Sequence, residues 1–258
     1  MNHDDDSPAV LNILGAGRAG TSLARAAAAV DLPVRIAASR PPGSLRLHLA
    51  QYAPRATAVP AAEIVPAEQS SPAIVVLMVP QEDLDSVDPG WLEGSILIDA
   101  TNRWADEPLP EWLQSGLDAG RTSSEAIAAR FSSATTVKAL NHVSHWDLDT
   151  AGRSGHSAHG SAHDPGHDSA HGSGHQSGRG SAQHSASERR ALGVAADDAG
   201  AAAAVGQLAV RLGFAPVMLP DLAAGRILEP DGPVFNRPMT AAEMARITGG
   251  TVVQTVDR

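Results

Sequence analysis

The segment Val10–Ala26 reads VLNILGAGRAGTSLARA and decides how the rest of the chain is interpreted. Its first five residues form a short apolar run typical of a buried strand, and the run Ala19–Val30 is rich in helix-forming residues. Three glycines join the two runs: Gly15, Gly17 and Gly20. In a strand–turn–helix unit they would permit a tight turn, let the backbone approach a diphosphate, and let the helix pack against the strand. A glycine-rich turn without any ligand is the alternative.

Apolar runs and helix-forming runs continue to alternate beyond this unit. Further strands are expected at Val34–Ser39, Thr57–Val59, Ala73–Pro80, Ser95–Asn102, Thr135–Asn141, Arg189–Asp197 and Ala215–Pro220. Helices are expected at Leu45–Tyr52, after the capping box Thr122–Glu125, and at Ala199–Leu212. This alternation predicts an α/β fold: a doubly wound, mostly parallel Rossmann-type sheet in a single domain.

The composition excludes several classes of protein. The net charge is −10, from 29 acidic and 19 basic residues, so we expect neither a nucleic-acid partner nor an anionic membrane partner. The chain has no cysteine, which excludes disulfides and thiolate chemistry. No apolar run is long enough to span a membrane, and MNHDDDSP at the N-terminus is not a signal peptide. A cytoplasmic protein is therefore expected.

One internal segment differs from the rest of the chain. Residues 151–187 include 9 Ser, 8 Gly and 7 His, with no Val, Ile, Leu, Met or aromatic residue. Such a segment cannot bury enough apolar area to become ordered, so we expect a disordered insertion within the domain. The expected organisation is a disordered acidic N-terminus (1–9), a nucleotide-binding part (10–150), the insertion, the remainder of the same domain (188–229) and a C-terminal tail (230–258).

The insertion contains histidines at a strict interval of four residues, at positions 159, 163, 167, 171 and 175. Its glycines and Pro165 disfavour a helix, but a flexible chain can still wrap a transition metal weakly. Repeat expansion in a tolerant loop is the alternative, and we assign no metal ligands. Titration with Zn²⁺ at neutral pH distinguishes the two, because only a metal site gives saturable heat.

The end of the second expected strand indicates which nucleotide binds. Sites that prefer NAD have an acidic residue there, whereas this chain has Ser39 and Arg40 and no acid nearby. A hydroxyl and a guanidinium suit the 2′-phosphate of NADP, with Arg18 and Arg46 as auxiliaries. The alternative is that Arg40 is an ordinary loop arginine.

Five segments together resemble one known family. In order they are NILGAGRAGTSLA, AASR, VVLMVPQED, ILIDATN and VKALN, and TSSEAIAARF precedes the last of them. The chain resembles the NADPH-dependent coenzyme F420 reductases, which are Rossmann proteins similar to 6-phosphogluconate dehydrogenase. The likeness covers Val10 to about Val143 and resumes more loosely from about Arg190 to Glu229. It implies direct hydride transfer between NADP(H) and the deazaflavin F420 as co-substrate.

The resemblance also implies roles for individual residues. Ser39 and Arg40 would hold the 2′-phosphate, and Val79 and Pro80 would line the cofactor near its ribose and diphosphate. The glycine turn, with Arg18 and Ala19, completes the cofactor site. Asn141 and Val143 would border the reacting rings, although Asn141 stands where the family has histidine.

The same comparison yields the catalytic candidates. Asn141 is expected to be a polar orienting residue, with His142 or His145 as a proton donor; a structural role is the alternative for both histidines. Lys138 is the only lysine and lies in the middle of an expected strand, which favours a fold or surface role over a catalytic one.

Two classes of function follow from the sequence. The first is an NADP(H)-dependent oxidoreductase acting on a deazaflavin, a flavin-like compound or another small redox acceptor. The second is an NADP(H)-binding or redox-sensing module without catalysis. Related reductases form dimers, and the segment 240–256 is a candidate helix and strand for packing on a second copy.

Overall fold

The computed structural model of the protein describes residues 10–66, 71–104, 107–149 and 189–253. The expected disorder of residues 1–9 and 151–187 and the histidine repeat fall outside these residues. None of the helices in the described ranges has the length and apolarity required to cross a bilayer.

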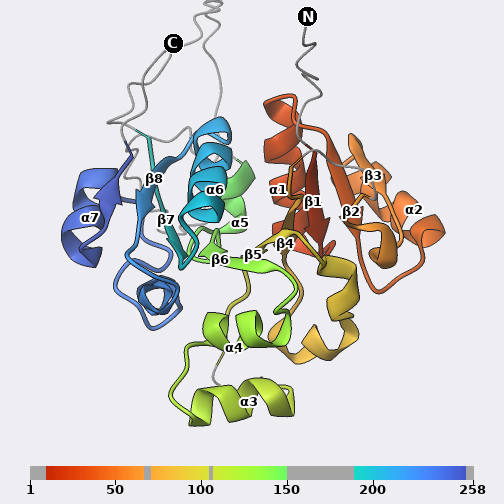
Figure 1. Ribbon diagram of the computed structural model, residues 1–258. Helices are drawn as coiled ribbons and strands as arrows, with labels where there is room; N and C mark the ends of the chain where they lie inside the picture. The colour runs from red at the N-terminus through yellow and green to blue at the C-terminus, as the bar shows by residue number, and fades with distance from the viewer. Residues whose placement is uncertain (1–9, 67–70, 105–106, 150–188, 254–258) are drawn as a thin grey trace, which may run out of the picture.

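The strands in the described residues belong to one sheet, shown in Figure 1. Their order in this sheet is β3-β2-β1-β4-β5-β6-β7-β8-β9. Its strands are β1 Leu11–Leu14, β2 Val34–Ala37, β3 Ala56–Ala58, β4 Ile74–Leu77, β5 Ile96–Asp99, β6 Thr135–Ala139, β7 Ala191–Ala196, β8 Ala215–Met218 and β9 Thr251–Val252. Neighbouring strands are parallel from β3 through β6, in the 3-2-1-4-5-6 order of a Rossmann sheet. The β6–β7 and β8–β9 pairs are antiparallel. The prediction of a mostly parallel, doubly wound sheet is confirmed.

Helices cover both faces of the sheet (Figure 1). One face packs against α1 Arg18–Ala29, α2 Pro42–Tyr52, α5 His145–Asp149 and α6 Ala199–Arg211. The other packs against α3 Glu111–Asp118, α4 Ser123–Arg130, α7 Ala241–Thr248 and the 3₁₀ turns η1 Ala61–Glu63, η2 Gln81–Ser86, η3 Pro89–Leu92 and η5 Ala223–Leu228. Each strand of the central part is therefore buried on both sides, which explains its continuous apolar sequence.

Local signals in the sequence fix several helix ends. The Thr122 hydroxyl accepts a hydrogen bond from the Glu125 amide at 3.1 Å, and the Glu125 carboxylate accepts one from the Thr122 amide at 2.7 Å. This is the capping box predicted ahead of α4. Asp198 caps α6 in a similar way by accepting from the Ala201 amide at 2.7 Å.

The C-terminal segment belongs to the same sheet. Residues 230–253, expected to be part of a tail, contain α7 and β9, and β9 pairs with β8 through Val217 and Met218. Met244 of α7 is fully buried against apolar side chains of β7 and β8. The predicted helix and strand are therefore present, and they pack within their own chain.

Candidate functional site

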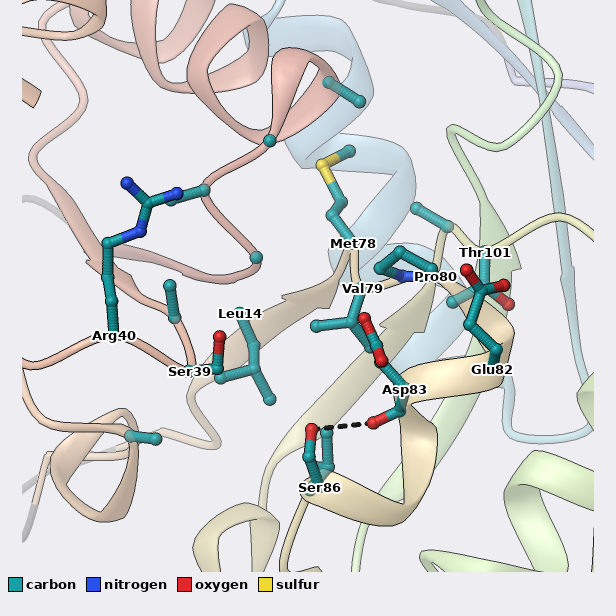
Figure 2. A pocket seen from close by; sticks show the side chains of 18 of the residues that line it. Leu14, Ser39, Arg40, Met78, Val79, Pro80, Glu82, Asp83, Ser86 and Thr101 are labelled. Atoms are coloured by element: carbon teal, nitrogen blue, oxygen red, sulfur yellow. Dashed lines mark hydrogen bonds between the residues drawn. The ribbon is translucent and has the colours of Figure 1, made fainter. Parts of the chain in front are cut away.

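A cavity of about 960 Å³ lies at the carboxyl ends of the parallel strands. Its walls come from the loops that follow β1, β2, β4 and β5, together with η1. Figure 2 shows Ser39 and Arg40 on one side of this space and Val79, Pro80 and Asp83 on the other. Ligands of doubly wound sheets bind at this edge, where crossovers on opposite faces leave a crevice.

Close backbone packing at two glycines shapes the first wall. Gly15 has φ +127°, and a Cβ at this position would overlap the Met78 carbonyl. A Cβ on Gly20 would overlap the Gly15 carbonyl oxygen, so only glycine lets the first turn of α1 approach this loop. Gly15 lines the cavity, whereas Gly20 is buried behind it. The packing role expected of the third glycine is thus visible in the structure.

The N-terminus of α1 opens into the cavity. Gly17, the N-cap residue, lines the cavity together with Arg18 and Ala19, and all three are exposed. Apart from Gly17 and its two chain neighbours, no atom lies within 4 Å of a Cβ placed on Gly17, so space is open in front of this backbone. The first amide groups of a helix have no partner within it and carry a partial positive charge. This geometry fits a diphosphate.

The basic side chains lie at the end of the cavity next to β2. Ser39 and Arg40 are exposed and line it together with Arg18. None of the lining residues that directly follow β2, at 38–42, is acidic. Arg46, the other expected auxiliary, lies on α2 and is not among the lining residues. The wall therefore suits a 2′-phosphate better than a free ribose diol.

The opposite wall is acidic. Val79 and Pro80 line the cavity as expected, and Glu82, Asp83 and Glu107 follow them around its edge. Burial raises the pKa of Glu107 above its ordinary value, and the neighbouring Glu82 carboxylate raises it further. Charge thus reverses along the cavity, from arginines near β2 to carboxylates near the ends of β4 and β5.

Asn141 and Val143, expected to border the reacting rings, are buried and are not among the lining residues. Asn141 is connected to the cavity through hydrogen bonds to the lining residue Asn102. Its side-chain amide donates to Asn102 Oδ1 at 3.1 Å and to the Leu228 carbonyl at 2.7 Å, and Asn102 Nδ2 donates to the Asn141 carbonyl at 2.9 Å. Asn102 itself lines the cavity. Asn141 therefore orients a lining residue from behind.

The structure does not support His142 as a proton donor. Its ring is fully buried, away from the lining residues, and Nε2 accepts a hydrogen bond from the Gly193 amide at 3.2 Å. Burial lowers the pKa of His142 to about 3, and the positive charges of Arg190 and Lys138 contribute further. The ring is neutral at physiological pH and fills a structural position between β6 and β7. The other histidine candidate, His145, begins α5 and is also absent from the lining residues.

Sequence reasoning missed the role of Thr101 and Asn102, which line the cavity directly after β5. The sequence patterns assign the segment DATN, at 99–102, to the end of an expected strand and to the family motif, but give it no role in the site. A strand that ends in several polar residues at the ligand-binding edge of a parallel sheet was the available signal. Lys138, expected in a fold or surface role, is completely buried beneath this segment.

Comparison with known proteins agrees with the site. Residues 10–103 match the family model described as NADP oxidoreductase, coenzyme F420-dependent, which confirms the resemblance inferred from the sequence. The matched range contains the glycine turn, Ser39–Arg40 and the segment ending at Asn102. The match supports an NADP-dependent oxidoreductase. No curated protein sequence matches the chain.

Solved structures show the same fold. A hypothetical protein from Sinorhizobium meliloti aligns with a TM-score of 0.66 and 23% identity, covering 92% of this chain and 97% of that one. A candidate F420-dependent NADP reductase from Arthrobacter sp. FB24 aligns with a TM-score of 0.56 and 20% identity, covering 84% and 86%. Glycerol-3-phosphate dehydrogenase from Coxiella burnetii gives 0.51 and 13%, with coverage of 84% of this chain and 55% of the enzyme.

Substitution of Gly17 should weaken NADPH binding, whereas substitution of Gly20 should lower the stability of the fold. Gly17→Ala adds a methyl group in open space facing the expected diphosphate, so NADPH affinity should fall about tenfold or more while the melting temperature stays near that of the wild type. Gly20→Ala should destabilise the protein by about 1–3 kcal/mol through overpacking against Gly15. Calorimetric NADPH titration and urea unfolding measure the two effects; equal effects of both substitutions would contradict the assignment.

His142 should make the protein sensitive to acid. Because folding lowers its pKa from about 6.5 to about 3, the stability it contributes is complete above about pH 6.5 and is lost as the pH falls toward 3. His142→Gln, which keeps an acceptor for the Gly193 amide, should flatten this dependence by up to about 1.4 kcal/mol per pH unit. Urea unfolding at pH 7, 5.5 and 4.5 measures it, with His145→Gln as control. Parallel curves for wild type and His142→Gln would contradict the prediction.

Proposed function

We propose that the protein is an NADPH-dependent oxidoreductase that transfers a hydride directly to a deazaflavin, coenzyme F420, or to a flavin-like acceptor. The observation that carries the proposal is the cavity, with the open backbone at Gly17 at the N-terminus of α1 and the Ser39–Arg40 pair beside it. The family match over residues 10–103 supports both the nucleotide and the class of reaction.

The chain offers a defined set of residues to hold NADPH. The amide groups at the start of α1 would bind the diphosphate, and the Arg40 guanidinium with the Ser39 hydroxyl would bind the 2′-phosphate. Val79 and Pro80 would pack against the middle of the molecule. The nicotinamide would then reach the segment Thr101–Asn102, at the end of the cavity away from Arg40.

The chemistry requires little from acid–base side chains. NADPH supplies the hydride from C4 of its nicotinamide, and the protein must hold donor and acceptor close together and exclude water. The neutral, buried state of His142 is consistent with such a reaction. Asn102, held by Asn141, would be the polar group that orients the nicotinamide end.

One observation favours a second candidate, an NADP(H)-binding or redox-sensing module without turnover. The family match ends at residue 103, and the expected residues of the reacting side, Asn141 to Val143, lie outside the lining of the cavity. Such a module would bind NADPH through the same residues. It would not oxidise NADPH, whichever acceptor is added.

Turnover distinguishes these candidates. The purified full chain should oxidise NADPH, followed at its nicotinamide absorbance, when oxidised coenzyme F420 is added and not in its absence. FMN and a small imine should be tested in parallel, because they represent the flavin-like and non-flavin acceptors. Tight NADPH binding without oxidation by any of the three would reject the enzyme and favour the binding module.

Arg40 should determine the preference for NADPH over NADH. Arg40→Ala removes charge-assisted hydrogen bonds worth about 1.5–3 kcal/mol, so NADPH affinity should fall about 10- to 100-fold while NADH affinity changes little. Arg46→Ala removes an equal charge from α2, outside the cavity lining, and serves as the matched control. The test is titration of each variant with both nucleotides. If Arg40→Ala weakened NADH and NADPH equally, the 2′-phosphate assignment would be wrong.

A further inference from the structure

A buried ion pair lies directly beneath the reacting end of the cavity. Lys138 Nζ on β6 contacts Asp99 Oδ2 on β5 at 3.1 Å, and both side chains have no exposed surface. The residues are register partners on neighbouring parallel strands. Gly225 of η5 covers the pair so closely that a Cβ there would lie 3.0 Å from Lys138 Cβ and Cγ.

The hydrogen bonds of this pair converge on one residue of the cavity wall. Asp99 Oδ1 accepts from the amide and from the hydroxyl of Thr101, at 3.0 and 2.7 Å. Lys138 Nζ donates to the Thr101 carbonyl at 2.8 Å. Ser124 of α4 donates to Asp99 Oδ2 at 2.7 Å and occupies the second carboxylate oxygen. The amide, carbonyl and hydroxyl of Thr101 are thus all fixed from below.

The network continues to the neighbouring loop. Gln81 Nε2 donates to the Thr101 hydroxyl at 2.9 Å, and Gln81 stands between Pro80 and Glu82, which both line the cavity. Asn102, the next lining residue along the chain, is held by Asn141 at the end of β6. The loops after β4, β5 and β6 are therefore fixed relative to one another by groups that do not themselves line the cavity.

A gain in folding stability does not by itself explain why this ion pair is buried. Removing two charges from water is costly, and well-packed apolar residues of similar volume are often as stabilising as a buried ion pair. A fully hydrogen-bonded pair does, however, fix the position of the backbone that it contacts. Here that backbone is Thr101, where the proposed function places the nicotinamide.

We propose that Asp99 and Lys138 are positioning residues for hydride transfer, which act by holding Thr101 and Asn102 against the nicotinamide of NADPH. The inference rests on the proposed function for the identity of the bound ring. It assigns the only lysine of the chain a role in the reaction without contact to either substrate. The binding of the 2′-phosphate at Arg40 and of the diphosphate at the start of α1 should be independent of the pair, because neither Asp99 nor Lys138 contacts these groups.

The test compares the double variant Asp99→Asn, Lys138→Met with the wild type. It removes both charges together, so no unpaired charge remains buried. NADPH should bind within about threefold of wild-type affinity, because the phosphate contacts persist. The fluorescence of the bound nicotinamide should shift toward that of free NADPH, and the rate of hydride transfer to coenzyme F420 should fall about 10- to 100-fold. Arg190→Met, which breaks the ion pair between a buried arginine and the half-buried Asp147 outside the cavity lining, controls for lost stability.

A second, milder variant keeps the test informative if the double variant does not fold. Ser124→Ala removes one hydrogen bond to Asp99 and leaves the ion pair in place, so it should change fluorescence and rate in the same direction by a smaller amount. Wild-type fluorescence and rate in either folded variant would overturn the inference, as would a loss that weaker NADPH binding explains entirely. If the wild type binds NADPH but reduces no acceptor, the proposed function fails, and the fluorescence comparison still decides the positioning role.

Discussion

The site depends on the close approach of α1 to the end of β1. Gly20 packs on the carbonyl of Gly15, and Gly15 packs on the carbonyl of Met78, at separations that leave no room for a Cβ at either position. These contacts join the ends of β1 and β4 and direct the first turn of α1 into the cavity. Without them the helix would stand away from the sheet, and its amide groups would not meet a diphosphate.

The two ends of the cavity carry opposite charges. Arg18 and Arg40 lie toward β2, and Glu82 and Glu107 lie at the opposite edge. NADPH carries its 2′-phosphate on the adenosine half, its diphosphate in the middle and its nicotinamide at the other end, so this arrangement of charge favours an orientation with the 2′-phosphate toward Arg40. In the proposed binding mode, the polar contacts near the nicotinamide would come from Thr101 and Asn102, which line the cavity. Their positions in turn depend on buried groups of β5 and β6.

The sequence predicted local features more successfully than distant contacts. The glycine turn, the alternation of strands and helices and the capping box at Thr122 follow from neighbouring residues, and each is present in the structure. The environment of His142 depends on Gly193, 51 positions away, beyond the histidine-rich segment. Asn141 is held by Leu228, which is 87 positions away. No local pattern reports these contacts, so the sequence placed both side chains at the reacting rings, whereas the structure buries them behind the cavity wall.

The burial of Lys138 could not be predicted either, because it also depends on contacts between distant segments. A lysine in the middle of a strand normally indicates an exposed position, and only the packing of α4 and η5 over β5 and β6 shows that it is buried with Asp99. An acidic residue at the end of one strand and a lysine in its parallel neighbour were each visible in the sequence. Their pairing required the register between the strands.

The site is tested by a crystal structure of the full chain with NADP⁺, supported by calorimetry of the same complex. We expect the diphosphate at the amide groups of Gly17–Ala19, the 2′-phosphate at Ser39 and Arg40, and the nicotinamide beside Thr101 and Asn102. If the chain bound no NADP⁺ at millimolar concentration, or bound it outside this cavity, the cavity would not be an NADP site.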